Sequence, residues 1–173
     1  MADIISHTTD NMLDEQQIWE ALKDVPDPEL PAISVVDMGI IRRIELDHEH
    51  THVQIEMTPT FTGCPAIPQI RERIQQRLAS LVAHVEVNVT FQKPWSSENL
   101  SDEAREKLHQ VGIAPPPRIV RGCTLPMLLQ QSLTCPYCGS RQTSMENIFG
   151  PTLCRAIAYC RQCHQPFEQF KPL

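Results

Sequence analysis

The chain has 173 residues and a formal net charge of −6, from 15 Lys and Arg against 21 Asp and Glu. This size allows one ordinary domain and a small second module. The acidic balance argues against a protein that binds nucleic acid by neutralising phosphates. No apolar run approaches the roughly 18 residues of a membrane-spanning helix, and the polar N-terminus is unlike a signal peptide. We therefore expect a cytoplasmic protein that contacts neither membrane nor nucleic acid.

The N-terminal part should contain a disordered polar arm followed by a helix. Residues 1–13 are predicted as the arm. Asp14 can cap the helix, with Gln17 as its capping-box partner. The helix should end before Pro26, because proline lacks the amide proton that a helix interior requires.

Alternating and helical spacings of apolar residues predict the rest of the first domain, which we place at residues 14–112. The order α-β-β-α-β predicts a two-layer α+β fold, and the third strand should return parallel to the second through a right-handed crossover. The predicted elements are a strand at 40–46, a strand at 53–57, a helix at 66–82, a strand at 85–91 and a short helix at 102–110.

The C-terminal part has a different composition. Residues 113–132 are rich in proline and are predicted as a linker. Residues 133–173 contain two Cys-x-x-Cys pairs separated by 21 residues, with Gly150-Pro151 as the turn of a hairpin between them. Two such pairs at this distance are typical of a zinc ribbon, in which zinc holds a small fold together. The predicted ligands are Cys135, Cys138, Cys160 and Cys163.

Other interpretations of these cysteines are weaker. Two redox dithiols would leave the matched spacing of the pairs unexplained. The Cys-x-x-Cys-His pattern that begins at Cys160 also occurs where haem is attached, but it would leave the upstream pair without a role. Cys154 should lie near the tip of the hairpin, far from the zinc, where packing is its favoured role. Cys123, in the linker, has no assigned role.

Three loops of the first domain should meet at one edge of its sheet, because the first two strands form a hairpin and the third runs parallel to the second. They are residues 34–39, 58–65 and 92–95. Within them, Cys64 stands before Pro65, which can occupy the first position of a helix. We therefore expect Cys64 to be the N-cap of the 66–82 helix, where the helix dipole would favour its metal-binding thiolate form. Asp37 could supply a carboxylate nearby, although a turn-forming role is the favoured interpretation of Asp37 taken alone.

Other candidate sites carry less weight. His48, His50 and His52 suggest a metal site, but they lie on the predicted hairpin turn and a solvated turn explains them. No phosphate-binding glycine loop and no nucleophile elbow is visible, so the sequence gives no sign of independent catalysis.

Several motifs resemble a known family, the iron–sulfur assembly-factor domains. The C-terminal segment resembles the zinc ribbon of the branch that serves phenylacetate degradation. The motifs are Asp27-Pro28-Glu29-Leu30-Pro31, Asp37-Met38-Gly39, the run from Thr58 to Ala66, Pro94-Trp95-Ser96-Ser97 and the ribbon from Phe149 to Lys171. Met38 and Phe61 depart from the Leu and Tyr that are usual in the family.

The resemblance implies a non-catalytic role in maturing a multicomponent phenylacetyl-CoA epoxidase. Cys64 matches the family's proposed residue for transient handling of iron or an iron–sulfur cluster, and the implied partners are the epoxidase subunits and other cluster-assembly proteins. A structural subunit of the oxygenase complex is an alternative, a nucleic-acid-binding ribbon is disfavoured, and the oligomeric state stays open. The edge of the site is expected to include Glu29, Thr58, Thr60 and Trp95.

Overall fold

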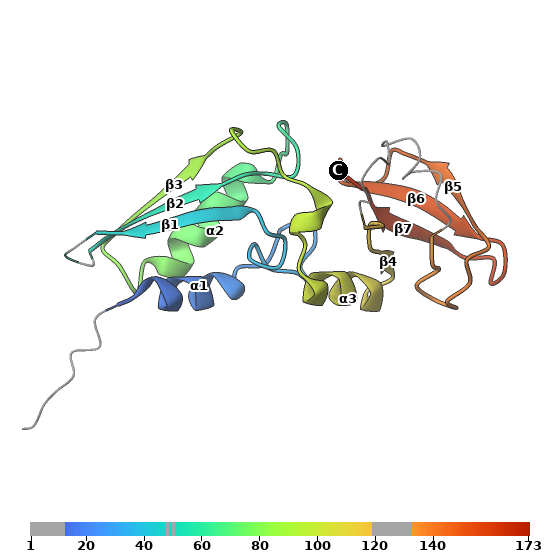
Figure 1. Cartoon of the computed structure of the whole chain (residues 1–173), viewed down its shortest axis with the longest axis horizontal. Coiled ribbons are helices and arrows are strands. Elements are labelled where there is room, and N and C mark those ends of the chain that lie inside the picture. The colour runs from blue at the N-terminus through green and yellow to red at the C-terminus, as the bar shows by residue number, and fades with distance from the viewer. Residues whose placement is uncertain (1–12, 48, 50, 119–132) are drawn as a thin grey trace, which may run out of the picture.

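The computed structural model describes residues 13–47, 49, 51–118 and 133–173. The structure therefore does not describe residues 1–12 of the predicted arm at 1–13, the turn residues His48 and His50, or Cys123. Two sheets stand at opposite ends of the molecule, with helix α3 (Asp102–Gln110) and the C-terminus between them (Figure 1).

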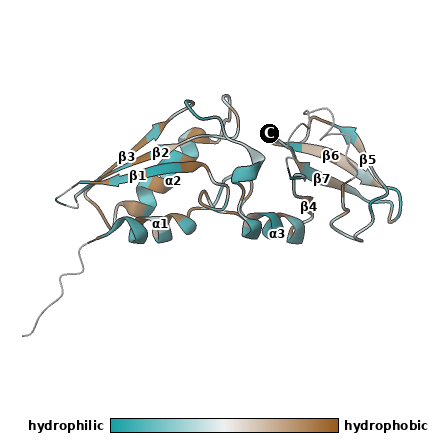
Figure 2. Ribbon diagram, in the orientation of Figure 1, coloured by the Kyte–Doolittle hydropathy of each residue, from teal (hydrophilic) through white to brown (hydrophobic). Residues whose placement is uncertain are grey.

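Helix α1 (Glu15–Lys23) begins as its sequence predicts. The Asp14 side chain accepts a hydrogen bond from the Gln17 amide at 2.7 Å, and the Gln17 side chain accepts one from the Asp14 amide at 2.9 Å. Ile18 and Leu22 are fully buried on one face. Hydrophobic and hydrophilic residues alternate around α1 and around helix α2 (Ile67–Leu78), as expected of helices that cover a sheet (Figure 2).

The first sheet has three strands in the order β1-β2-β3, namely β1 (Ile41–Leu46), β2 (His52–Met57) and β3 (His84–Val89). β1 and β2 are antiparallel, and β2 and β3 are parallel. Both helices pack on the same side of this sheet (Figure 1), so the predicted two-layer α+β fold is confirmed. Helix α2 is shorter than the predicted 66–82: it ends at Leu78, and residues 79–81 form a turn that exposes Leu81 while Val82 stays buried.

A short 3₁₀ helix, η1 (Ser97–Asn99), precedes α3, whose N-cap is Ser101 as expected. Two residues that the sequence assigns to the linker instead form strand β4 (Ile113–Ala114). β4 pairs with the last strand of the second sheet. The predicted linker boundary at 113 was wrong in this respect, because a two-residue strand has no periodicity that a sequence pattern can reveal.

The second sheet has the order β4-β7-β6-β5, with β5 (Thr143–Asn147), β6 (Arg155–Cys160) and β7 (Pro166–Phe170). The predicted hairpin around Gly150-Pro151 joins β5 to β6 in antiparallel pairing. The sequence pattern did not predict β7, which pairs antiparallel with β6.

One hydrophobic core extends from the first domain (the first module) into the C-terminal zinc ribbon (the second module). Phe170 of β7 and Cys154, which precedes β6, are buried in the same cluster as Leu22 and Ile55 of the first domain. The chain end is also fixed, because the Leu173 carbonyl accepts hydrogen bonds from the Ser97 amide and the Ser96 hydroxyl, each at 3.0 Å. Within the described ranges, no helix has the length and apolar character needed to cross a membrane.

Candidate functional site

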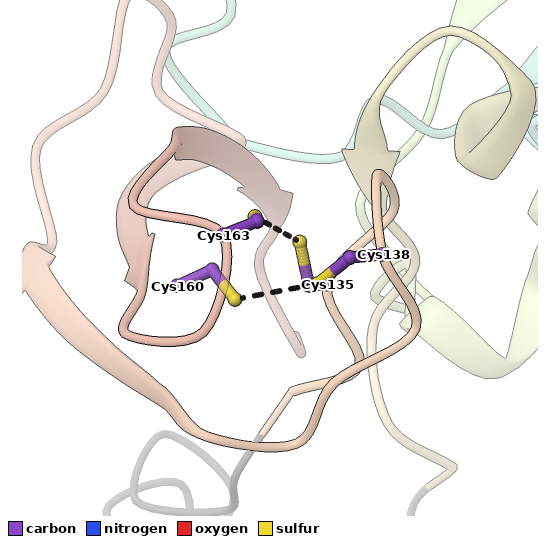
Figure 3. Close-up of side chains that lie close together, drawn as sticks. All are labelled: Cys135, Cys138, Cys160 and Cys163. Carbon is purple, nitrogen blue, oxygen red and sulfur yellow. Dashed lines mark hydrogen bonds between the residues drawn. The ribbon is translucent and has the colours of Figure 1, made fainter.

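The four cysteines of the two Cys-x-x-Cys pairs converge at one end of the second sheet (Figure 3). Their sulfur atoms all lie within 4.8 Å of one another. The Sγ atoms of Cys135 and Cys163 are 3.7 Å apart, and those of Cys138 and Cys160 are 3.6 Å apart. Each of these two contacts joins one pair to the other.

These distances fit a zinc ion. Zinc–thiolate bonds of about 2.3 Å in a regular tetrahedron place the sulfurs about 3.8 Å apart. The four sulfurs have nearly this spacing, and cysteine thiolates are the ligands of closed structural zinc sites. Each Cys-x-x-Cys pair lies in a tight turn, or knuckle. A bound zinc ion would cross-link the two knuckles and contribute folding free energy to a module with a small core of its own.

Backbone hydrogen bonds shape both knuckles. The Gly139 amide donates to the Cys135 carbonyl at 2.9 Å, and Gly139 has a φ of 72°, which glycine adopts without strain. In the second knuckle the His164 amide donates to the Cys160 carbonyl at 2.9 Å. Hydrogen bonds from the Cys163 and Gln162 amides lower the pKa of the Cys160 thiol to about 6. This thiol is therefore prepared to bind metal as a thiolate.

The second candidate site is the loop that contains Cys64. Cys64 is not the N-cap that the sequence predicts, because helix α2 begins at Ile67, with Ala66 as its N-cap. Cys64 belongs to the preceding turn, in which the Ile67 amide donates to its carbonyl at 3.4 Å. Pro68, rather than the predicted Pro65, lies within the first turn of α2.

The expected preference of Cys64 for the thiolate form is also wrong. Burial raises the pKa of its thiol above the ordinary value of 9.0, and the negative charges of Glu29 and Asp27 raise it further. Hydrogen bonds from the Ala66 and Ile67 amides oppose this change without outweighing it. Cys64 is thus a half-buried thiol whose ionisation a nearby positive charge, such as a metal cation, would favour.

The carboxylates near Cys64 come from the Asp27-Pro28-Glu29 motif. Asp27 is 7% exposed, and its Oδ1 accepts hydrogen bonds from the Glu29 and Leu30 amides, both at 2.8 Å. Burial nevertheless raises the pKa of Asp27, and it also raises that of Glu29. Asp27 was not predicted as a site residue from the sequence, although its position beside Glu29 in an extended motif was the available signal.

Asp37 has a different environment from the one expected. Its carboxylate accepts hydrogen bonds from the Ser34 amide at 3.0 Å and from Lys107 Nζ at 2.6 Å. Burial opposes the ionisation of Asp37, but these contacts outweigh it and lower its pKa below the ordinary value. The Asp37 carboxylate is thus paired with Lys107, and its role beside Cys64 stays a prediction. Its contacts join the 34–39 loop to helix α3.

The other predicted edge residues are buried or half-buried. Thr58 is buried, and its hydroxyl has no hydrogen-bond partner among the described residues. Thr60 is half-buried in the loop that leads to Cys64. Trp95 is buried and donates its indole N–H to the Met38 carbonyl at 2.9 Å, so its role in the structure is packing and positioning.

Cys154 lies at the junction of the two modules. It is 5% exposed, and its sulfur lies 3.2 Å from the Thr152 hydroxyl. Burial raises the pKa of this thiol to about 11, and the charges of Glu29 and Asp27 contribute to the rise. The same two carboxylates therefore act on Cys64 and on Cys154, although the two cysteines are far apart in sequence.

Comparisons with known families cover both modules. The family described as iron-sulfur cluster assembly protein matches residues 15–111, which span α1 to α3. The family described as PaaD zinc beta ribbon domain matches residues 124–171, which include all four clustered cysteines.

One curated relative is similar to nearly the whole chain, and another is similar to about half of it. A protein of Escherichia coli, described as one of the subunits of a putative 1,2-phenylacetyl-CoA epoxidase, is 32% identical over 90% of this chain and 91% of its own length. The Fe-S protein maturation auxiliary factor SufT of Staphylococcus aureus is 34% identical over 47% of this chain and 92% of its own length. The second relative therefore matches the first module alone.

A solved structure supports the fold of the first module. The crystal structure of a domain of unknown function, DUF59, from Bacillus anthracis is 33% identical in sequence, with a TM-score of 0.51. The match covers 54% of this chain and 90% of the other chain.

Proposed function

Because this chain belongs to the iron–sulfur cluster assembly protein family and carries the PaaD zinc β-ribbon at its C-terminus, we propose that it is a non-catalytic accessory protein that helps to mature a phenylacetyl-CoA epoxidase. The similarity to an epoxidase component over nearly the whole chain supports this client. The similarity of the first module to Fe–S protein maturation factors supports the role in metal assembly.

Cys64 is the residue that would hold the cargo, iron or an iron–sulfur cluster, before it passes to the oxygenase or the reductase of the client. The observation that carries this proposal is a half-buried Cys64 thiol whose pKa is raised by burial and by the negative charges of Glu29 and Asp27. A cation that binds there would favour the thiolate and relieve the desolvation of two acidic groups. Because the thiol resists ionisation when no cation is present, its metal binding should be reversible, as a transfer site requires.

The zinc ribbon has a structural role in this proposal. Its four sulfurs have the closed arrangement of a structural site, and its strand β7 contributes Phe170 to the core of the first module. The ribbon thereby positions a surface for a client protein next to the Cys64 loop.

The test is the metal content of an epoxidase produced together with a Cys64→Ser variant. We expect the variant to fold and keep its zinc, while the client contains less iron than with the wild-type protein. Thr62→Ala is the matched control, since Thr62 is an exposed neighbour in the same loop. Normal iron loading of the client with Cys64→Ser would refute the proposal.

A further inference from the structure

A cleft of about 910 Å³ lies between the two modules. One wall comes from the first module and includes Glu29, Leu30 and Val111. The opposite wall comes from the ribbon and includes Tyr137 and Phe149. The Asp-Pro-Glu motif near Cys64 therefore also forms part of a groove that exists only because the ribbon packs against the first module.

The rim of this cleft exposes large apolar side chains. Phe149 is 72% exposed, Tyr137 58% and Val111 54%. Ile148, next to Phe149, is 47% exposed and extends the apolar surface beyond the cleft. Contiguous exposed apolar surface of this kind is typical of sites that bind another protein.

The polar groups of the cleft carry excess negative charge. Arg155 donates to Glu168 at 2.7 Å, with the Arg155 and Glu168 side chains 14% and 34% exposed, so this guanidinium is already paired. Glu29 has no ion-pair partner among the described residues. Burial together with the charge of Asp27 raises its pKa, and the charge of Arg155 opposes this rise without outweighing it. A cationic group in the cleft would compensate the Glu29 carboxylate.

We propose that this cleft binds a segment of the client protein in which a lysine or arginine lies among large apolar side chains. The apolar side chains pack against Phe149, Tyr137 and Val111, and the basic side chain pairs with Glu29. This inference rests on the proposed function in one respect, the identification of the partner as the client. Glu29 links the cleft to the Cys64 site, because it lines the cleft and its charge raises the pKa of the Cys64 thiol.

The open rim favours a protein segment over a small molecule. Small-molecule sites bury most of the ligand in a concave pocket, whereas the walls here leave Phe149 and Tyr137 more than half exposed. Exposed aromatic side chains beside a charged group match the composition of protein interfaces.

The probe is a short fluorescein-labelled peptide of leucine and lysine, with a leucine and glutamate peptide for comparison. Binding to the full-length, zinc-loaded protein is followed by fluorescence anisotropy. We expect the lysine peptide to bind more tightly than the glutamate peptide. Glu29→Gln and Phe149→Ser should each weaken its binding by roughly tenfold, as expected from loss of a partly buried charge pair or of an aromatic contact.

Two matched controls separate the cleft from general attraction to an acidic protein. Glu72→Gln removes the same charge from the exposed face of α2, and Phe91→Ser removes an exposed aromatic ring outside the cleft. Both should bind the lysine peptide as the wild type does. Equal weakening by the controls, or equal binding of the two peptides, would overturn the inference. Cys64→Ser should leave peptide binding unchanged, so failure of metal transfer and failure of the docking site are distinguishable.

Discussion

The ring of Phe170 packs against the indole of Trp95, with ring centroids 5.8 Å apart and planes inclined by 50°. Trp95 lies in the loop that follows β3, at the same edge of the first sheet as the Cys64 loop. Phe170 ends the last strand of the ribbon. Both are buried, with exposures of 6% and 0%. Because aromatic pairs of this kind add to the stabilisation from burial, the contact makes the ribbon part of one packed unit with the site-bearing module.

Phe170→Ala should therefore destabilise the first module as well as the ribbon. Truncation of a buried phenylalanine costs about 3–5 kcal/mol, and the cavity would lie beneath Trp95. Denaturant unfolding followed by circular dichroism measures the effect. The matched control is Phe91→Ala, because Phe91 is half exposed and its loss should change the free energy of unfolding by less than about 0.5 kcal/mol. A stability of Phe170→Ala close to the wild type would contradict a shared core.

Removal of zinc should increase the exposure of the Trp95 indole to water. The cysteine cluster fixes the end of β6 and the turn that leads into β7, so its loss should loosen Phe170 and expose the indole to water. In a Trp19→Phe background, Trp95 is the sole tryptophan. We expect chelation to release one zinc per chain and to shift the Trp95 fluorescence to longer wavelength. Unchanged emission after complete zinc loss would show that the two modules are independent.

The sequence predicted best those features that depend only on residues close together in the chain. The Asp14–Gln17 capping box and the apolar stripe of α2 depend on neighbouring residues, and both are present. Features that depend on contacts between distant segments were missed. Asp27 and Cys154 approach each other only through the packing of the ribbon, and strand β4 exists only because β7 lies beside it. The pKa of Cys64 was misjudged for the same reason, since burial and distant acids determine it.

Alkylation rates should report the charges around Cys64. The thiolate is the reactive form, so the rate at Cys64 should still be rising with pH above its ordinary pKa of 9.0. Glu29→Gln removes a negative charge, lowers the thiol pKa and should raise the rate at pH 8 by about twofold. Glu72→Gln should leave the rate unchanged. Mass spectrometry of iodoacetamide-treated protein resolves each cysteine, and Cys154, buried and with a pKa of about 11, should react far more slowly.

The ion pair between Asp37 and Lys107 should make stability depend on pH. The pKa of Asp37 is lower in the folded chain than its ordinary 3.8, so its contribution is complete above that value. The contribution is lost as the pH falls through the lower folded value. Lys107→Met should cost about 1 kcal/mol at pH 7, because the lysine is partly exposed. This difference from the wild type should shrink as the pH falls below about 3.8, as measured by urea unfolding. Lys93→Met, at an exposed position, should show no such trend.

Gly39→Ala should be among the most damaging single changes to the site-bearing module. Gly39 has a φ of 65°, and a Cβ atom there would lie 2.1 Å from the backbone carbonyl oxygen of Asn99. The substitution therefore combines a left-handed backbone with a clash that only backbone movement can relieve, and we expect a loss of about 2 kcal/mol or more in the free energy of unfolding. Gly63→Ala is the matched control, because a Cβ atom at Gly63 would meet nothing within 4 Å and the φ of Gly63 is not in the left-handed range. In thermal unfolding, the melting temperature of Gly63→Ala should be close to that of the wild type, and that of Gly39→Ala should be well below it. Similar melting temperatures for the two variants would contradict the close approach of η1 to the Asp37-Met38-Gly39 turn.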